Sequence, residues 1–372
     1  MNTIPVFKPQ LPLAEKLLPY IQSIDTTNIY TNIGPLCKSF ETRLAQHFGV
    51  QDGEVITCAN GTLALTQGLL ALGARPGGVC VMPSWTFVAT PAAARFANLE
   101  PYFIDVHLNS WAIHPEDIYP LLKTQNISAV IPVAPYGKPL NCAEWEDFHK
   151  KTGIPVLIDA AAAFDSFSIN QMPNTTTIPF MVSLHATKVL GVGEGAVLVT
   201  KNNDLSRLVR QLGNFGFFES RYAEVVGINS KLSEYSAAVG LAALDDWKEI
   251  RNQWQKLSSH FYELASNTPS VTTMPDFNQG WISCYGLIEF EKPVLNYVRK
   301  RLGEMGIEER SWWGNGCHSQ TAYSLCPRHN LPNTEILVNR VLGLPFWIGL
   351  SIGDMKYIFE CLRKILLEIK NI

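Results

Sequence analysis

The sequence predicts an α/β protein whose large domain holds a mainly parallel central sheet flanked by helices. From about residue 54 to residue 200, short apolar runs alternate with segments that have a helical pattern. The apolar runs are continuous, which is typical of strands buried on both faces of a parallel sheet. Polar residues recur directly after these runs, and ligands of such sheets gather at the carboxyl ends of the strands.

The expected strands, in chain order, are 54–58, 78–82, 101–106, 128–134, 154–158, 179–184 and 196–200. The expected helices begin at Thr62 or span 85–97 and 142–151. Five residues fall just past a predicted strand: Asn60, Ser84, Tyr136, Asp159 and Ser183. Their shared position predicts a site at one edge of the sheet.

A smaller C-terminal α/β domain is expected beyond a long helix at 241–264. Its expected elements are a strand at 281–290 and helices at 293–305 and 353–369. We therefore predict a large domain over residues 15–245 and a small domain over 246–372. Residues 1–14 are expected to associate with the site or with the small domain.

Composition excludes several classes of function. The chain has 372 residues, is 47% apolar and 17% charged, and carries a net charge of −3. This composition supports two packed domains and gives no basic surface for nucleic acid or membrane. The N-terminus lacks the basic and apolar regions of a signal peptide, and no apolar stretch reaches the length of a membrane span. We expect a cytoplasmic protein.

The cysteines and histidines do not predict a metal site. The eight cysteines are scattered without a CxxC pair, which is typical of reduced cytosolic thiols packed in a core. One cluster, Cys317-His318 with Cys326 and His329, has a spacing that fits no common zinc pattern.

A lysine and a carboxylate give the sharpest indication of chemistry. Lys188 closes the run that starts at Ser183, just before Gly193-Glu194-Gly195, and Asp159 ends an apolar strand 29 positions upstream. A lysine whose pKa is depressed by an apolar pocket can form a Schiff base with pyridoxal phosphate (PLP). A buried carboxylate can keep the pyridine nitrogen protonated, and a serine hydroxyl can contact the phosphate. Taken alone, Lys188 would be interpreted as a solvated loop lysine and Asp159 as a helix N-cap. Together they predict a PLP site.

Two further motifs agree with this interpretation. Asn60-Gly61-Thr62 follows a strand and opens a helix, where free N–H groups and the helix dipole favour a phosphate. Trp85 lies at a strand-to-helix junction, where an aromatic ring can stack on a flat heteroaromatic group. Alone, the first motif would be an ordinary turn and the second a core tryptophan.

With these residues in place, the chain resembles the DegT/DnrJ/EryC1/StrS family of PLP-dependent nucleotide-sugar aminotransferases, which have the fold type I (aspartate aminotransferase-like) architecture. The likeness covers nearly the whole chain. It includes Asn32–Pro35, Ala59–Leu65, Pro83–Thr90, Tyr136-Gly137, Asp159–Ala161, Ser183–Lys188 and Gly227–Glu234.

The resemblance implies a role for each matching residue. Lys188 would form the internal aldimine and Asp159 would hold the pyridine nitrogen, and both would be catalytic. The coenzyme phosphate would be bound by Gly61, Thr62 and Ser183, and Trp85 would stack on the ring. Asn229 would reach the phosphate of the neighbouring subunit, which implies a homodimer with shared active sites. Candidate substrate contacts are Tyr30, His185, Trp312, Trp313 and His318.

The sequence departs from the family pattern in two places. Ala162 stands three residues after Asp159, where relatives usually have Gln or His, so one polar contact near the coenzyme is missing unless a group such as Asp165 replaces it. The Trp312-Trp313 pair lies in a loop that is Tyr-rich in many relatives. These tryptophans either shape the acceptor pocket or pack the small domain.

The expected reaction moves an amino group from an amino acid, with L-glutamate as the expected donor, to a nucleotide-linked keto sugar. A dTDP- or UDP-4-keto-6-deoxy hexose is the acceptor that the resemblance suggests, in amino-sugar, O-antigen and lipopolysaccharide biosynthesis. One alternative is a PLP-dependent sugar dehydratase of the same fold, although such relatives carry His at the lysine position. Another is a regulatory protein that binds PLP without turnover.

Overall fold

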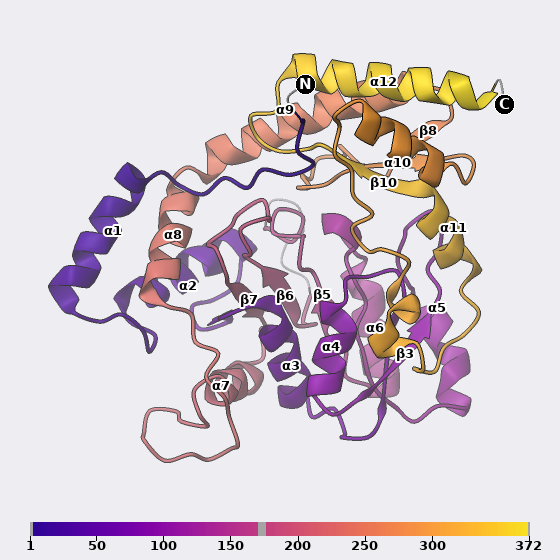
Figure 1. Cartoon of the computed structure of the whole chain (residues 1–372). Coiled ribbons are helices and arrows are strands. Elements are labelled where there is room, and N and C mark those ends of the chain that lie inside the picture. Colours follow the sequence, from indigo (N-terminus) through magenta and orange to yellow (C-terminus); the bar gives the residue numbers. More distant parts are fainter. Residues whose placement is uncertain (1–2, 170–175, 371–372) are drawn as a thin grey trace.

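The computed structural model describes residues 3–169 and 176–370 and has two parts. The lower part in Figure 1 is a sheet with helices around it, and the upper part is formed by the C-terminal third of the chain. The predicted boundaries at residues 1 and 372 lie outside the described residues. The strands of the lower sheet are β1 (Val55–Cys58), β2 (Val79–Pro83), β3 (Glu100–Ile104), β4 (Ile127–Val130), β5 (Ile158–Asp159), β6 (Phe180–Ser183) and β7 (Ala196–Val199).

The lower sheet is mainly parallel, as predicted. Its order is β3-β2-β4 followed by β5-β6-β7-β1, and parallel bridges from Val130 to Val156 and from Val133 to Asp159 join the two groups. Strand β7 runs antiparallel to both of its neighbours, whereas the other pairs are parallel. Nearly every residue of these strands is buried, which explains why the apolar runs show no alternation.

Helices cover the sheet closely. Helix α3 (Gly61–Ala71) lies on strands β6 and β7. A Cβ atom at Gly68 would come within 2.8 Å of side-chain atoms of Leu157 and Leu198, so only glycine permits this approach. The other helices of this part are α1 (Ala14–Thr27), α2 (Pro35–Phe48), α4 (Ala89–Phe96), α5 (Pro115–Ile118), α6 (Cys142–Thr152), α7 (Asn203–Leu212) and α8 (Glu234–Asp245). Short 3₁₀ turns span Tyr119–Lys123 and Pro135–Gly137.

Two predicted helices begin or end at different residues. The helix expected at 85–97 starts only at Ala89, because the backbone first turns between Ser84 and Thr86. The helix expected at 241–264 is in fact two helices, α8 and α9 (Trp247–Ser266). They meet at Asp246, whose φ of −99° and ψ of 7° interrupt the helical path. Helix α8 begins seven residues earlier than predicted because Ser233 caps it by accepting a hydrogen bond from the Ser236 N–H.

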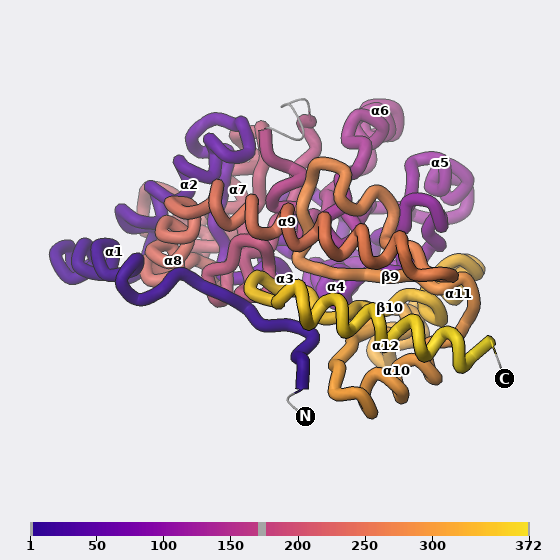
Figure 2. The backbone as a smooth tube through the Cα atoms, turned by 90° about the horizontal axis from the view of Figure 1, so that it is seen from above, coloured from indigo at the N-terminus to yellow at the C-terminus, as the bar shows by residue number. Residues whose placement is uncertain are grey.

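The upper part is a three-stranded antiparallel sheet with helices packed on it. Its strands are β8 (Val271–Thr273), β9 (Gly286–Phe290) and β10 (Val341–Leu344), in the order β10-β9-β8. Its helices are α9, α10 (Leu295–Glu304), α11 (Pro332–Arg340) and α12 (Ile352–Lys370). The 3₁₀ turns at Cys317–Ser319 and Thr321–Tyr323 lie against the lower sheet, where the Cys317 N–H donates to the Ser84 carbonyl at 2.9 Å. Figure 2 shows α9 and α12 running side by side across the molecule.

The start of the chain lies against this upper part. Ile4 pairs in parallel with Ile307, and the Trp347 indole donates a hydrogen bond to the Pro5 carbonyl. Residues 7–13 then cross to the loop that carries Lys188. We propose the domain division at residues 245 and 246 on the basis of the break between α8 and α9. Within the described residues, no helix is both long and apolar enough to cross a membrane.

A buried ion pair fastens the two parts together. The Asp165 side chain is 1% exposed and accepts hydrogen bonds from Arg251 Nε at 2.7 Å and Nη2 at 3.2 Å. It also accepts the Ile282 N–H at 3.1 Å. Because Arg251 lies on α9 and Ile282 precedes β9, one carboxylate fixes two segments of the upper part to the lower part.

We expect Asp165→Ala to lower the free energy of unfolding by about 3 kcal/mol, because it leaves a largely buried guanidinium and a buried N–H without their acceptor. Urea unfolding followed by circular dichroism would measure this change. Asp147→Ala, which breaks an exposed pair with Lys151, serves as the control and should change stability by less than about 1 kcal/mol. Equal effects of the two substitutions would contradict the expectation.

Candidate active site

The predicted site residues come together at one edge of the lower sheet. Asp159 ends β5, Ser183 ends β6, and Lys188 lies on the loop between β6 and β7. Gly61 opens α3 directly after β1. The carboxyl ends of parallel strands thus bring together residues that are far apart in the sequence.

The Lys188 loop is held by backbone hydrogen bonds to the glycine-containing segment that follows it. The Ala186 N–H donates to the Gly193 carbonyl at 2.8 Å, and the Leu184 N–H donates to the Gly195 carbonyl at 2.9 Å. The Lys188 side chain is directed inward, and its Nζ lies 2.8 Å from the Tyr285 hydroxyl. The loop therefore presents one amine at a fixed position.

The charge environment of Lys188 corrects one prediction. Burial lowers the pKa of Lys188, as the sequence suggests, but Tyr285, Cys284 and Asp159 raise it by more, so the net pKa lies above the usual value. The coenzyme-free protein therefore carries Lys188 as an ammonium group at neutral pH. The apolar pocket is real, yet its polar neighbours determine the protonation state.

The Asp159 carboxylate is buried and held at both oxygens. It is 5% exposed; Oδ2 accepts from the Thr90 hydroxyl at 2.7 Å, and Oδ1 accepts from the Ala161 N–H at 3.1 Å. Thr90 is in turn 2.8 Å from the Thr86 hydroxyl. Burial raises the pKa of Asp159, while the two hydrogen bonds and the charge of Lys188 oppose this rise. A cationic ring nitrogen is a group that would stabilise this carboxylate further.

The expected phosphate site has the geometry of a helix N-terminus. Asn60 caps α3 by accepting the Leu63 N–H at 3.0 Å, and the Ala64 N–H bonds the Asn60 carbonyl. Within residues 3–169 and 176–370, no hydrogen bond occupies the N–H groups of Gly61 and Thr62. A Cβ atom at Gly61 would lie 3.2 Å from the Met181 sulfur, so the helix start fits tightly against β6. These N–H groups and the Ser183 hydroxyl fit a bound phosphate.

Trp85 is 2% exposed and lies among other aromatic rings. It meets Trp111 edge to face at 6.4 Å and Trp313 at 5.4 Å. Its indole N–H is buried and has no hydrogen-bond partner among the described residues. An unsatisfied donor next to the carboxyl ends of the strands is consistent with a ligand at this point.

The two tryptophans of the C-terminal loop have different surroundings. Trp313 stacks on Tyr136, with ring centroids 3.8 Å apart and planes at 17°. Trp312 packs edge to face against Tyr285 and Phe7. Trp313 thus belongs to the aromatic group around Trp85, whereas Trp312 links the N-terminal segment to the tyrosine beside Lys188.

His318 lies close to the same aromatic group. Its Nδ1 is 2.7 Å from the Ser84 hydroxyl, and its backbone N–H donates to that hydroxyl at 3.2 Å. Burial lowers the pKa of His318, so its ring is neutral at pH 7. Ser84 therefore sets the orientation of a neutral imidazole at the edge of the site.

Of the three remaining predicted residues, His185 lies on the Lys188 loop, where its carbonyl accepts the Lys188 N–H at 2.8 Å. Tyr30 and Asn229 do not contact Lys188 within the described residues of this chain. His185 bonds Thr187 at 2.8 Å and faces Glu194 at 3.6 Å, within the loop itself. Tyr30 lies on the segment between α1 and α2, outside this cluster. It is 46% exposed and stacks on Tyr235 of α8. Asn229 is exposed and pairs with Asn214. The role expected for Asn229 requires a second subunit, and the expected contact of Tyr30 with substrate stays a prediction.

The structure also accounts for the departure at Ala162. Asp165 does not replace the missing polar group, because Arg251 and Ile282 already occupy its carboxylate. The Ala162 backbone packs closely against the turn at Gly137: a Cβ atom at Gly137, whose φ is +97°, would lie 2.6 Å from the Ala162 carbonyl oxygen.

Sequence reasoning missed two residues that contact the predicted catalytic pair, Thr90 and Tyr285. Thr90 holds the Asp159 carboxylate, and Tyr285 contacts Lys188. Thr90 lies in the run Pro83–Thr90, which carries the family resemblance and contains Trp85, so the sequence did offer a reason to consider it. Tyr285 lies 97 positions from Lys188, in a segment whose sequence predicts only a strand.

Comparisons with known proteins agree with this geometry. The sequence profile of the DegT/DnrJ/EryC1/StrS aminotransferase family matches residues 13–363. The chain belongs to this family. A relative from Shigella dysenteriae, dTDP-4-amino-4,6-dideoxy-D-glucose transaminase, is 31% identical over 97% of this chain and 99% of its own length. The Pseudomonas aeruginosa UDP-2-acetamido-2-deoxy-3-oxo-D-glucuronate aminotransferase is 28% identical over 89% of this chain and 90% of its own length.

Solved structures give the same fold. The crystal structure of a PLP-dependent aminotransferase from Bacillus cereus, described as putative, has a TM-score of 0.89 and 29% identity, covering 97% of this chain and 100% of that one. The structure of DesI with its TDP-sugar product has a TM-score of 0.87 and 28% identity, covering 100% and 96%. Fold type I is therefore confirmed, and the cofactor of this aminotransferase family member is PLP.

Proposed function

We propose that this aminotransferase moves an amino group from L-glutamate to a keto sugar linked to a nucleotide. The convergence of Lys188 and Asp159 at the same sheet edge, with Asp159 buried and Lys188 partly buried, carries this proposal. The printed activities of the Shigella and Pseudomonas relatives support a nucleotide-sugar acceptor. A dTDP- or UDP-linked 4-keto-6-deoxy hexose is the acceptor class that we would test first.

The side chains divide the work by chemistry. When bound, PLP supplies an electron-withdrawing ring that makes the α-proton of an attached amino acid acidic. Lys188 would hold the coenzyme covalently and, once released, move a proton as a base and then as an acid. Asp159 would hold the ring nitrogen. Gly61, Thr62 and Ser183 would bind the phosphate, and Trp85 would lie against the ring.

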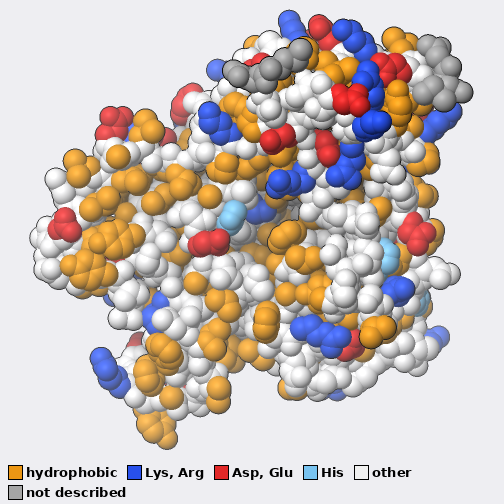
Figure 3. Space-filling view, viewed as in Figure 1, with side chains coloured by type: hydrophobic (Ala, Val, Ile, Leu, Met, Phe, Trp, Pro, Cys, Tyr) orange, Lys and Arg blue, Asp and Glu red, His pale blue; other side chains and the backbone are white. Residues whose placement is uncertain are grey.

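The acceptor would approach past the aromatic residues and the N-terminal segment. A cavity of about 420 Å³ lies beside Lys188, between residues 7–13 and helices α8 and α9. Figure 3 shows Lys and Arg side chains near the middle of this face, where the surface is hollowed. Trp313 and His318 would contact the sugar, because Trp313 packs on Trp85 and His318 bonds the adjacent Ser84. Trp312 would pack the wall of the site.

We further propose a homodimer. Large apolar side chains stand exposed along the segment that carries Asn229, with Val226 at 96%, Tyr222 at 75% and Phe215 at 49%. Such a patch is unusual on a monomer and typical of an interface. A second copy would cover it and place Asn229 at the partner's phosphate site. Light scattering should give twice the mass of the chain.

The decisive experiment tests both halves of the reaction separately. Glutamate is added to the PLP-loaded protein, and 2-oxoglutarate is measured; the resulting amino form is then offered a panel of nucleotide keto sugars. We expect stoichiometric 2-oxoglutarate and one class of aminated sugar. Loss of a sugar hydroxyl without amination would indicate a dehydratase, and binding of PLP without 2-oxoglutarate would indicate a regulatory protein. Either result would overturn the proposal.

A further inference from the structure

We propose that Tyr285 is a catalytic residue that holds the Lys188 amine in both of its protonation states. The inference rests on the proposed function, because it assigns a role within the same site. Neither the β-rich pattern around residue 285 nor the family motifs point to this tyrosine.

The contact itself is direct and partly buried. Lys188 Nζ and the Tyr285 hydroxyl are 2.8 Å apart, and no other hydrogen bond to Nζ is present within the described parts of the chain. An ammonium group can donate a hydrogen bond to the phenol oxygen, and a neutral amine can accept a hydrogen bond from the phenol O–H. A tyrosine therefore fits a lysine that gains and loses a proton, whereas a carboxylate would favour only the cation.

The phenol is fixed in place by its surroundings. The Ser283 hydroxyl accepts the Tyr285 N–H at 3.1 Å and donates to the Tyr136 carbonyl at 2.7 Å. The ring of Tyr285 meets the rings of Tyr136 and Trp312 edge to face, at 5.2 and 5.1 Å. These contacts also explain why β9 starts only at Gly286 and not at the predicted residue 281: the preceding residues bond the lower domain instead.

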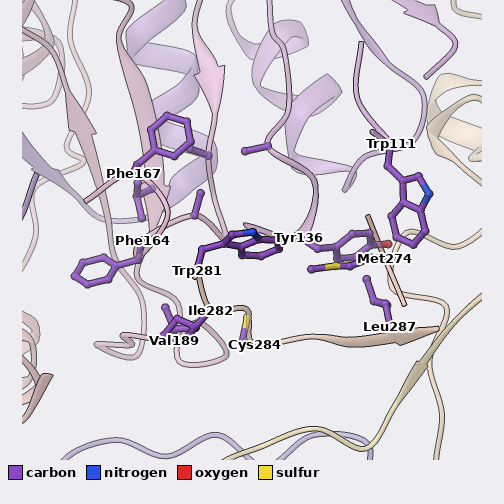
Figure 4. Packing of buried hydrophobic residues seen from close by; sticks show 14 of the residues in the cluster. Trp111, Tyr136, Phe164, Phe167, Val189, Met274, Trp281, Ile282, Cys284 and Leu287 are labelled. Atoms are coloured by element: carbon purple, nitrogen blue, oxygen red, sulfur yellow. The ribbon is translucent and has the colours of Figure 1, made fainter. Parts of the chain in front are cut away.

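The same segment is tied to the lower domain on its other side. Ile282 bonds the Asp165 carboxylate, and Figure 4 shows Ile282 and Cys284 beside Val189, which follows Lys188. The position of the phenol thus depends on how the small domain sits on the large one. Through Tyr285, the packing of the two domains therefore determines the position of a group that bonds the Lys188 amine.

Among the described residues, no other neighbour can do the same work. The groups that face Lys188 are Tyr285, Cys284 and Asp159. Burial raises the pKa of the Cys284 thiol to about 11, so it is neutral at pH 7 and only a weak donor. The Asp159 carboxylate already accepts hydrogen bonds from the Thr90 hydroxyl and the Ala161 N–H. Ala162 offers only a methyl group.

Tyr285→Phe tests the proposal because it removes one oxygen and keeps the ring. We expect kcat for the glutamate half-reaction to fall about 10- to 100-fold, with KM for glutamate changed less than about twofold. In the coenzyme-free protein, loss of the phenol removes an acceptor that favours the ammonium form, so the pKa of Lys188 should fall. The rate of PLP incorporation, followed by visible absorbance against pH, should then show its inflection at lower pH.

Tyr297→Phe is the matched control, because its hydroxyl bonds Glu368 in the small domain and it lacks contact with the site. It should leave kcat and the inflection unchanged. Ser283→Ala, which keeps the phenol but releases its anchor, should give a smaller loss of kcat and provides a second test if Tyr285→Phe does not fold. Unchanged kcat and an unchanged inflection in folded Tyr285→Phe would overturn the proposal. PLP incorporation needs no sugar, so this test remains readable if the proposed acceptor is wrong.

Discussion

Replacing Lys188 with alanine is expected to abolish transamination, with kcat for the glutamate half-reaction reduced at least about 10⁴-fold. The structure places one amine at the site, held by its loop and by Tyr285. Because the same amine would hold the coenzyme and carry the proton, its removal ends both functions at once. The visible absorption band of the lysine-bound coenzyme should be absent, and production of 2-oxoglutarate should stop.

Two variants make the result specific to the amine. Lys188→Arg keeps a positive charge but supplies no nucleophilic amine at neutral pH, so it should be as inactive as the alanine variant. Lys151→Ala removes an exposed lysine that pairs with Asp147 and should retain full activity. Turnover by Lys188→Ala at the native rate would refute the assignment of this residue.

The part of the site that sequence could predict is the part that depends on local chain direction. Asp159 and Ser183 end their strands and Gly61 comes shortly after one, and a parallel sheet brings such positions to one edge. Their placement therefore required only the strand pattern. The same reasoning confirmed the mainly parallel sheet, although it did not identify β7 as the antiparallel member.

The remaining features depend on contacts between distant segments. Tyr285 reaches Lys188 because Asp165 and Tyr136 hold the approach to β9, and no local pattern encodes that arrangement. The pKa of Lys188 was predicted in the wrong direction for the same reason: the apolar pattern around it was visible, but its polar neighbours were not. The break at Asp246 was hidden because no Gly or Pro marks it between residues 241 and 264.

Asp159→Asn should separate the electrostatic role of this carboxylate from its structural role. An amide cannot stabilise a protonated ring nitrogen as an anion does, so we expect kcat to fall about 10²- to 10³-fold at saturating PLP. The amide oxygen can still accept the Ala161 N–H, and the amide NH2 can donate to the Thr90 hydroxyl, which keeps the local geometry. The half-reaction with glutamate, measured as 2-oxoglutarate released per coenzyme bound, would give the size of the loss.

Whereas Asp159→Asn should lower kcat, it should not lower the free energy of unfolding of the coenzyme-free protein at pH 7. Because burial raises the pKa of Asp159 above its unfolded value, this group's contribution favours the coenzyme-free fold below the unfolded pKa and is lost as pH rises through the folded pKa. The amide that replaces it in Asp159→Asn does not titrate, so the coenzyme-free variant should be at least as stable as the native protein at pH 7, with its relative advantage smaller at low pH. Urea unfolding at several pH values would measure this difference, and Asp147→Asn, at an exposed position, should show neither effect. A variant that is both fully active and less stable at pH 7 would show that the carboxylate serves the fold rather than the reaction.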